Sequence, residues 1–134
     1  LILEFIKALA EYEKLSHEVV ADEDLLRRSL FGDRPAAEVV IAEIAGRPAG
    51  FALFFHSFST FLGRPGIYLE DLFVKPELRG RGIGRRLLGF LAKIALERGC
   101  GRLEWSVLDW NTEAIRFYEN LGAEASALAP LKSR

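Results

Sequence analysis

Between residues 79 and 84 the chain reads Arg79-Gly80-Arg81-Gly82-Ile83-Gly84, and this stretch separates an apolar, strand-like run from a long amphipathic run. Glycines let the backbone approach a ligand closely, and the free N–H groups at the start of a helix attract an anion. Arg79, Arg81, Arg85 and Arg86 add positive charge nearby. The stretch therefore predicts a loop between a strand and a helix that binds a phosphate or pyrophosphate.

Spacing excludes two other phosphate-binding loops. A dinucleotide fingerprint needs a glycine three places after Gly82, where the chain has Arg85, and a P-loop needs a Lys followed by Ser or Thr, which is absent here. A simple glycine turn before a solvated basic helix start is the alternative without a ligand. The spacing alone leaves both interpretations open.

Hydrophobic periodicity predicts the elements around this loop. We expect helices over the first dozen residues, from an Asp22 cap to about residue 31, over 82–98 and from 111 to about 121, and strands over 38–44, 50–55, 67–74 and 102–107, with turns at 45–48 and 63–66. Strands that alternate with helices favour a parallel sheet, whereas the hairpin adds antiparallel pairing. The predicted fold class is α/β with a mixed central sheet flanked by helices.

Composition limits the class of protein. The 134 residues are 50% hydrophobic and 28% charged with a net charge of -1, which predicts one globular domain over 1–134 and gives no basic field for nucleic acid. No apolar run approaches the roughly 18 residues of a membrane span, so we expect a cytoplasmic protein without membrane contact. Cys100 is the single cysteine, and its glycine neighbours predict a structural thiol at a helix exit rather than a metal or redox site.

Glu70 and Asp71 form an acidic pair inside the apolar strand over 67–74. Regular alternation would direct their side chains to opposite faces, so at least one should be buried or in a cleft. An alkyl amine has a pKa near 10, so only about one molecule in a thousand is neutral at pH 7 and a nucleophilic amine needs a base. The pair therefore predicts an amine site, with a structural ion pair to neighbouring arginines as the alternative.

The motif Arg79-x-x-Gly82-x-Gly84 resembles the R/Q-x-x-G-x-G/A loop of the GNAT N-acetyltransferases. Segments 9–13, 68–74, 109–118 and 121–123 resemble, in order, those of the spermidine/spermine (polyamine and diamine) N-acetyltransferase family. The resemblance implies the GNAT acyl-CoA N-acyltransferase fold, acetyl-CoA as co-substrate without a metal, direct transfer to an amine, and a homodimer.

The resemblance also implies roles for individual residues. Glu70 is the expected general base, Asp71 helps to hold the amine, and the Tyr118 hydroxyl protonates the departing thiolate. Plain helix packing is the alternative for Tyr118. The expected cofactor-binding residues are Leu72, Phe73, Val74, Arg79, Gly80, Arg81, Gly82, Ile83, Gly84, Arg85, Asn111 and Tyr118.

The acceptor stays open at this stage. A small polyamine, diamine or lysine-like amine is the first hypothesis, protein amino groups are the second, and a CoA-binding module without catalysis is the third. His17 and His56 are expected to have a structural or surface role, whereas the loops over 58–66 and 13–22 could line the acceptor pocket. The family's first strand and last strands have no counterpart in this chain, which suggests that both are lacking.

Overall fold

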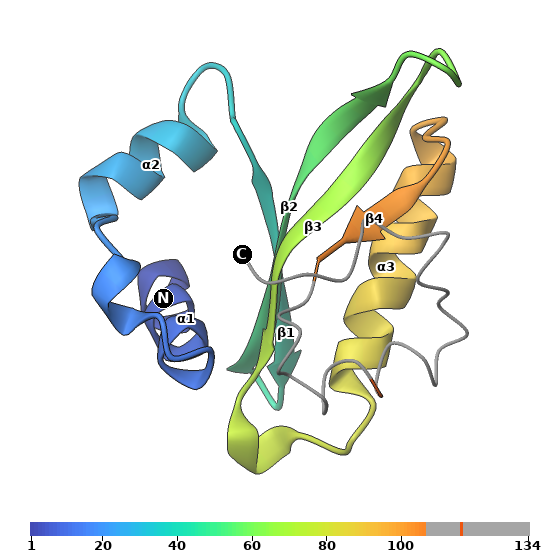
Figure 1. The fold of residues 1–134 in the computed structure, drawn as a ribbon. Coiled ribbons are helices and arrows are strands. Elements are labelled where there is room, and N and C mark those ends of the chain that lie inside the picture. Colours follow the sequence, from blue (N-terminus) through green and yellow to red (C-terminus); the bar gives the residue numbers. More distant parts are fainter. Residues whose placement is uncertain (107–115, 117–134) are drawn as a thin grey trace.

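The computed structural model describes residues 1–106 and 116 of the chain. In chain order the elements are α1 (Ile2–Tyr12), η1 (Ser16–Glu18), α2 (Glu23–Phe31), β1 (Glu38–Ile44), β2 (Arg47–Ser59), β3 (Arg64–Val74), η2 (Pro76–Leu78), α3 (Ile83–Glu97) and β4 (Leu103–Trp105). Figure 1 shows α1 and α2 on one face of the sheet and α3 on the other.

The four described strands form one mixed sheet in the order β1-β2-β3-β4. β1 and β3 both pair antiparallel with β2, whereas β3 and β4 run parallel. The predicted mixed sheet is therefore confirmed. The parallel pairing joins only Ile67, Tyr68 and Leu69 to β4, and β3 continues beyond it to Val74.

Each face of the sheet has its own core. The amphipathic helix expected over 82–98 is α3, and it buries one face: Ile83, Leu87, Leu88, Leu91 and Ala95 pack with Ala52, Phe54, Ile67 and Leu69. On the other face, α1 and α2 cover the sheet through Phe5, Leu9, Leu30, Phe51, Leu53 and Phe73. Burial of this kind contributes roughly 25 cal/mol per Å² of apolar surface, so both helical layers are held mainly by these clusters.

The predicted helix ends are confirmed at two places. Asp22 caps α2, since its carboxylate accepts a hydrogen bond of 2.8 Å from the Leu25 N–H. At the exit of α3, Gly99 has a φ of 69° and the Cys100 N–H donates to the Ala95 carbonyl at 2.8 Å. The half-buried Cys100 packs against the α3 core, as expected for a structural thiol.

The predicted turn over 63–66 is wrong. β2 and β3 pair as far as Ser59 opposite Arg64, and the turn comprises residues 60–63. Gly63, with a φ of 64°, donates to the Ser59 carbonyl at 2.8 Å. Gly66 instead permits close packing within the strands, because a Cβ there would lie 2.9 Å from the Ser57 Oγ.

Two further expectations are only partly covered. The strand expected over 102–107 is described as β4, three residues long, followed by Ser106 outside the strand. The helix expected from 111 lies outside the described residues except for Arg116, which is helical. Within the described part of the chain, no helix has the length and apolar character needed to cross a membrane.

A bidentate ion pair joins the edge strand β1 to the C-terminus of α3. Arg98 donates to both carboxylate oxygens of Glu38, at 2.6 and 2.9 Å, and His56 Nδ1 lies 3.9 Å from the same carboxylate. The hydrogen bond from Arg98 holds the pKa of Glu38 below its usual value of 4.5, and Glu38 in turn raises the pKa of Arg98. The pair fastens the two layers together at this edge.

The substitution Glu38→Gln should lower the free energy of unfolding at pH 7 by roughly 0.5 kcal/mol, because both partners are about 40% exposed and screened by solvent. The pKa of Glu38 is depressed in the folded state, so its contribution is fully present above pH 4.5 and is lost as the pH falls through the lower folded value. Urea unfolding at pH 7 and pH 3 measures the difference.

As a control, Arg27→Met removes the fully solvated pair with Asp24 on α2 and should change stability less. An equal loss for Glu38→Gln at both pH values would contradict an electrostatic origin.

Candidate active site

The glycine-rich loop has the geometry of an anion site. Gly80 and Gly82 have φ values of 81° and 82°, in the left-handed region that favours glycine. Gly82 is the N-cap of α3, whose first turn contains no acidic residue. No described atom lies within 4 Å of a Cβ built on Gly80 or Gly82, so the loop is open on that side. The first N–H groups of α3 are thus available to an anion.

Charges around the loop support the same conclusion. Arg81, Arg85 and Arg86 are exposed, whereas Ile83 is buried and anchors the start of α3 in the core. The predicted loop residues are therefore brought together at one helix N-terminus, and the positive end of the helix dipole adds to their charge.

The end of β3 lies next to this loop along the chain. Leu72 and Val74 pack against the α3 core, while Phe73 belongs to the opposite core. Beyond Leu69 no described strand pairs with β3 on the side of β4. This edge carries Leu72, Phe73 and Val74, which are among the expected cofactor-binding residues.

The acidic pair lies at an irregularity of β3. Leu69 pairs with Phe54 and Asp71 with Leu53, so Glu70 is an extra residue in the strand, which is a β-bulge. Leu69 and Leu72 are three positions apart, yet both pack toward α3. The expectation of regular alternation is therefore wrong here, because the bulge resets the direction of the side chains. Glu70 and Asp71 are both half-buried.

Arg79 differs from the other arginines of the loop. Its Nε donates a hydrogen bond of 2.9 Å to the Val74 carbonyl. Its guanidinium carbon lies 4.8 Å from the Tyr12 ring centre and 5.4 Å from that of Phe73. The side chain is thus engaged within the protein, between α1 and the end of β3.

The sequence patterns did not predict these aromatic contacts, nor two contacts made by Tyr68. The Tyr68 hydroxyl lies 2.6 Å from the Ser106 Oγ, which ties β3 to the residue after β4, and the Tyr68 ring stacks on Phe55 at 5.3 Å. The partners are distant in sequence, so no local pattern could have revealed them. Asn111 and Tyr118 lie outside the described residues.

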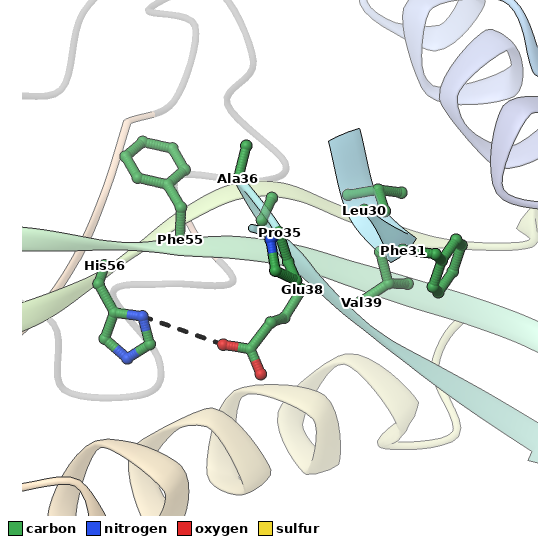
Figure 2. Close-up of a pocket in the computed structure, with 9 residues that line it drawn as sticks. Leu30, Phe31, Pro35, Ala36, Glu38, Val39, Phe55 and His56 are labelled. Carbon is green, nitrogen blue, oxygen red and sulfur yellow. Dashed lines mark ion pairs between the residues drawn. The ribbon is translucent and has the colours of Figure 1, made fainter. Parts of the chain in front are cut away.

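A cavity of about 420 Å³ lies elsewhere, beside the start of β1 (Figure 2). It is lined by Leu30, Phe31, Pro35, Ala36, Ala37, Glu38, Val39, Phe55 and His56. None of the predicted site residues in the described ranges lines it. His56 is paired with Glu38 there and His17 is exposed in η1, so neither histidine joins the acidic pair.

The chain is similar to known acetyltransferases over most of its length. It is 45% identical over 131 residues to thialysine N-epsilon-acetyltransferase of Bos taurus, covering 92% of this chain and 76% of that protein. It is 33% identical to L-ornithine N5-acetyltransferase of Arabidopsis thaliana, covering 92% and 74%. The solved structure of an aminoglycoside N-acetyltransferase in complex with CoA has a TM-score of 0.66 over 98% of this chain and 87% of that one, at 23% identity, which shows a shared fold.

Residues 5–123 match the Acetyltransferase (GNAT) family. This match includes the loop over 79–84, β3 and both helical layers, and it confirms the resemblance inferred from the glycine-rich motif. The protein is an acetyltransferase that belongs to the GNAT family.

Proposed function

We propose that this enzyme transfers the acetyl group of acetyl-CoA directly to the primary amine of a small lysine-like, diamine or polyamine acceptor. The observation that carries the proposal is the open, glycine-rich backbone at the start of α3, close in the chain to the end of β3 that bears Glu70 and Asp71. The names of the relatives support the acceptor class, since thialysine and ornithine both carry a side-chain amine.

The residues present fit acetyl-CoA. The open left-handed backbone at Gly80 and Gly82 and the unblocked start of α3 suit a pyrophosphate, with Arg81 and Arg85 at its edge. The free edge of β3 at Leu72, Phe73 and Val74 can pair with amide groups as another strand would. Asn111 and Tyr118 are the remaining residues proposed to bind acetyl-CoA. Acetyl-CoA supplies the acetyl group as a thioester.

Side chains of the protein carry out the two proton transfers of the proposed reaction. Glu70 takes the proton from the acceptor ammonium, directly or through water, and Asp71 holds the amine by charge. The Tyr118 hydroxyl donates a proton to the sulfur that leaves. Glu70 lies on the bulge, where the strand turns a side chain out of the regular pattern, as bulges next to active sites do.

Glu70→Gln should lower kcat by about 10²-fold at pH 7, within the range for loss of a general base. The loss should shrink at pH 9 to 10, where more of the amine is already neutral. Tyr118→Phe should lower kcat at every pH and leave the affinity for acetyl-CoA largely intact, because only the hydroxyl is removed and the ring remains. Steady-state kinetics over pH 6–10, with calorimetric binding of CoA, separates the two. A parallel loss of CoA affinity in both variants would contradict these roles.

Gly82→Ala should weaken CoA binding and destabilise the fold by about 1 kcal/mol, because an alanine is strained at a φ of 82°. Gly89→Ala is the matched control: Gly89 lies in the interior of the same helix with no described atom near its Cβ, so alanine should stabilise by roughly 0.5–1 kcal/mol and leave binding unchanged. Urea unfolding and calorimetry test both. Equal behaviour of the two variants would argue against a special backbone at Gly82.

The acceptor class is tested by thiol release from acetyl-CoA at pH 7 and pH 9. Thialysine, lysine, ornithine, putrescine, spermidine and a lysine peptide form the panel. We expect turnover on the free amines and at least tenfold lower kcat/KM on the peptide, a difference of about 1.4 kcal/mol. Faster turnover on the peptide would point to protein amino groups, and CoA binding without turnover would point to a module that does not catalyse.

The homodimer and the cytoplasmic location are proposed on the sequence resemblance and composition alone. Analytical ultracentrifugation tests the first.

A further inference from the structure

Four arginines surround the proposed phosphate loop, and the structure separates one of them from the rest. Arg81, Arg85 and Arg86 are exposed, whereas Arg79 is half-buried. The hydrogen bond of Arg79 is directed back to the carbonyl of Val74, five residues earlier in the chain. A guanidinium engaged in this way does not extend from the loop as a free cation.

The guanidinium also contacts two aromatic rings from different elements. Tyr12 is the last residue of α1, and Phe73 is the penultimate residue of β3. Distances of 4.8 and 5.4 Å from the guanidinium carbon to the two ring centres are within the range of cation–π attraction. Arg79 therefore links α1, β3 and the glycine loop through a single side chain.

Phe73 extends this link into the core. Its ring lies 6.0 Å from that of Phe5, which in turn stacks on Phe51 at 5.2 Å. Phe5, Phe51 and Phe73 are all at most 5% exposed. Arg79 thus contacts an aromatic column made of Phe73, Phe5 and Phe51. The next residue, Gly80, has a φ of 81° and is the first residue of the loop.

We propose that Arg79 is a positioning residue, which sets the Gly80–Gly82 loop against β3 and the C-terminus of α1 instead of binding the cofactor through its charge. The proposal rests on the proposed function, in which this loop holds the pyrophosphate of acetyl-CoA. The hydrogen bond from Arg79 takes one of the two lone pairs of the Val74 carbonyl, at the end of the strand edge that is proposed to face the cofactor. Tyr12, far away in sequence, becomes a determinant of cofactor affinity.

The test compares CoA affinity in Arg79→Gln, Tyr12→Leu and the double variant by calorimetry. If Arg79 acts through Tyr12, each single variant should weaken CoA binding about fivefold. The double variant should bind CoA as well as the single variant with the lower affinity, because the effects of coupled residues are not additive. Tyr12→Phe keeps the ring and should restore most of the affinity lost in Tyr12→Leu. Arg34→Gln, in the exposed segment before β1, controls for the loss of an arginine.

Salt dependence provides an independent readout. Direct charge contacts weaken as salt rises, so Arg81→Gln should flatten the dependence of CoA affinity on ionic strength, whereas Arg79→Gln should keep the slope of the unsubstituted protein. A flattened slope in Arg79→Gln together with unchanged affinity in Tyr12→Leu would overturn the proposal and make Arg79 a direct phosphate ligand. Failure of the unsubstituted protein to bind CoA would instead overturn the proposed function.

If Arg79→Gln does not fold, Arg79→Lys takes its place. Lysine keeps the charge and loses the planar fork, so a positioning role predicts weakened binding with an unchanged salt slope. Full CoA affinity in folded Arg79→Lys would overturn the proposal, because charge alone would then suffice.

Discussion

The β-bulge at Glu70, just beyond the last described pairing of β3 with β4, is the constraint on which the rest of the site depends. Among the described strands, β3 pairs with both β2 and β4 at Ile67, Tyr68 and Leu69, and beyond the bulge it pairs with β2. Backbone groups on such an edge need a partner, which a ligand amide can supply. The same stretch carries the Glu70 bulge and leads through η2 into the glycine loop. The strand edge proposed for the cofactor, the acidic pair and the proposed anion loop therefore all come from one continuous segment, 70–84.

The two helical layers contact the glycine loop in different ways. One face of α3 is buried against the sheet from Ile83 to Ala95, which anchors the N-terminus of the helix at the glycine loop. α1 packs on the opposite face through Phe5 and reaches the same loop by way of Tyr12 and Arg79. An enzyme that must place a thioester beside an amine to within about 3.5 Å needs this rigidity, since small displacements are costly in rate. The aromatic column supplies it without a covalent link.

Local patterns predicted most of the elements and failed where tertiary pairing decided the outcome. The apolar face of α3, the Asp22 cap and the Gly99 exit follow from spacing and backbone preference, and all are confirmed. The turn near Gly63 was misplaced because Pro65 and Gly66 looked like turn residues. Gly66 instead allows the strands to pack closely. Regular alternation fails between Leu69 and Leu72 because of a bulge, and a bulge exists only relative to a partner strand.

By itself the sequence identified the family, because the spacing of Arg79, Gly82 and Gly84 and the order of the flanking segments resemble those of the GNAT enzymes. The sequence also indicated that the acidic pair could supply a base, because burying a carboxylate in an apolar strand is costly unless it has a partner. Only the tertiary structure decided what Arg79 does. Its charge looks the same in the sequence as that of Arg81, yet its partners Tyr12 and Val74 come from α1 and β3. Side-chain direction depends on contacts between distant segments, and these form only when the chain has folded.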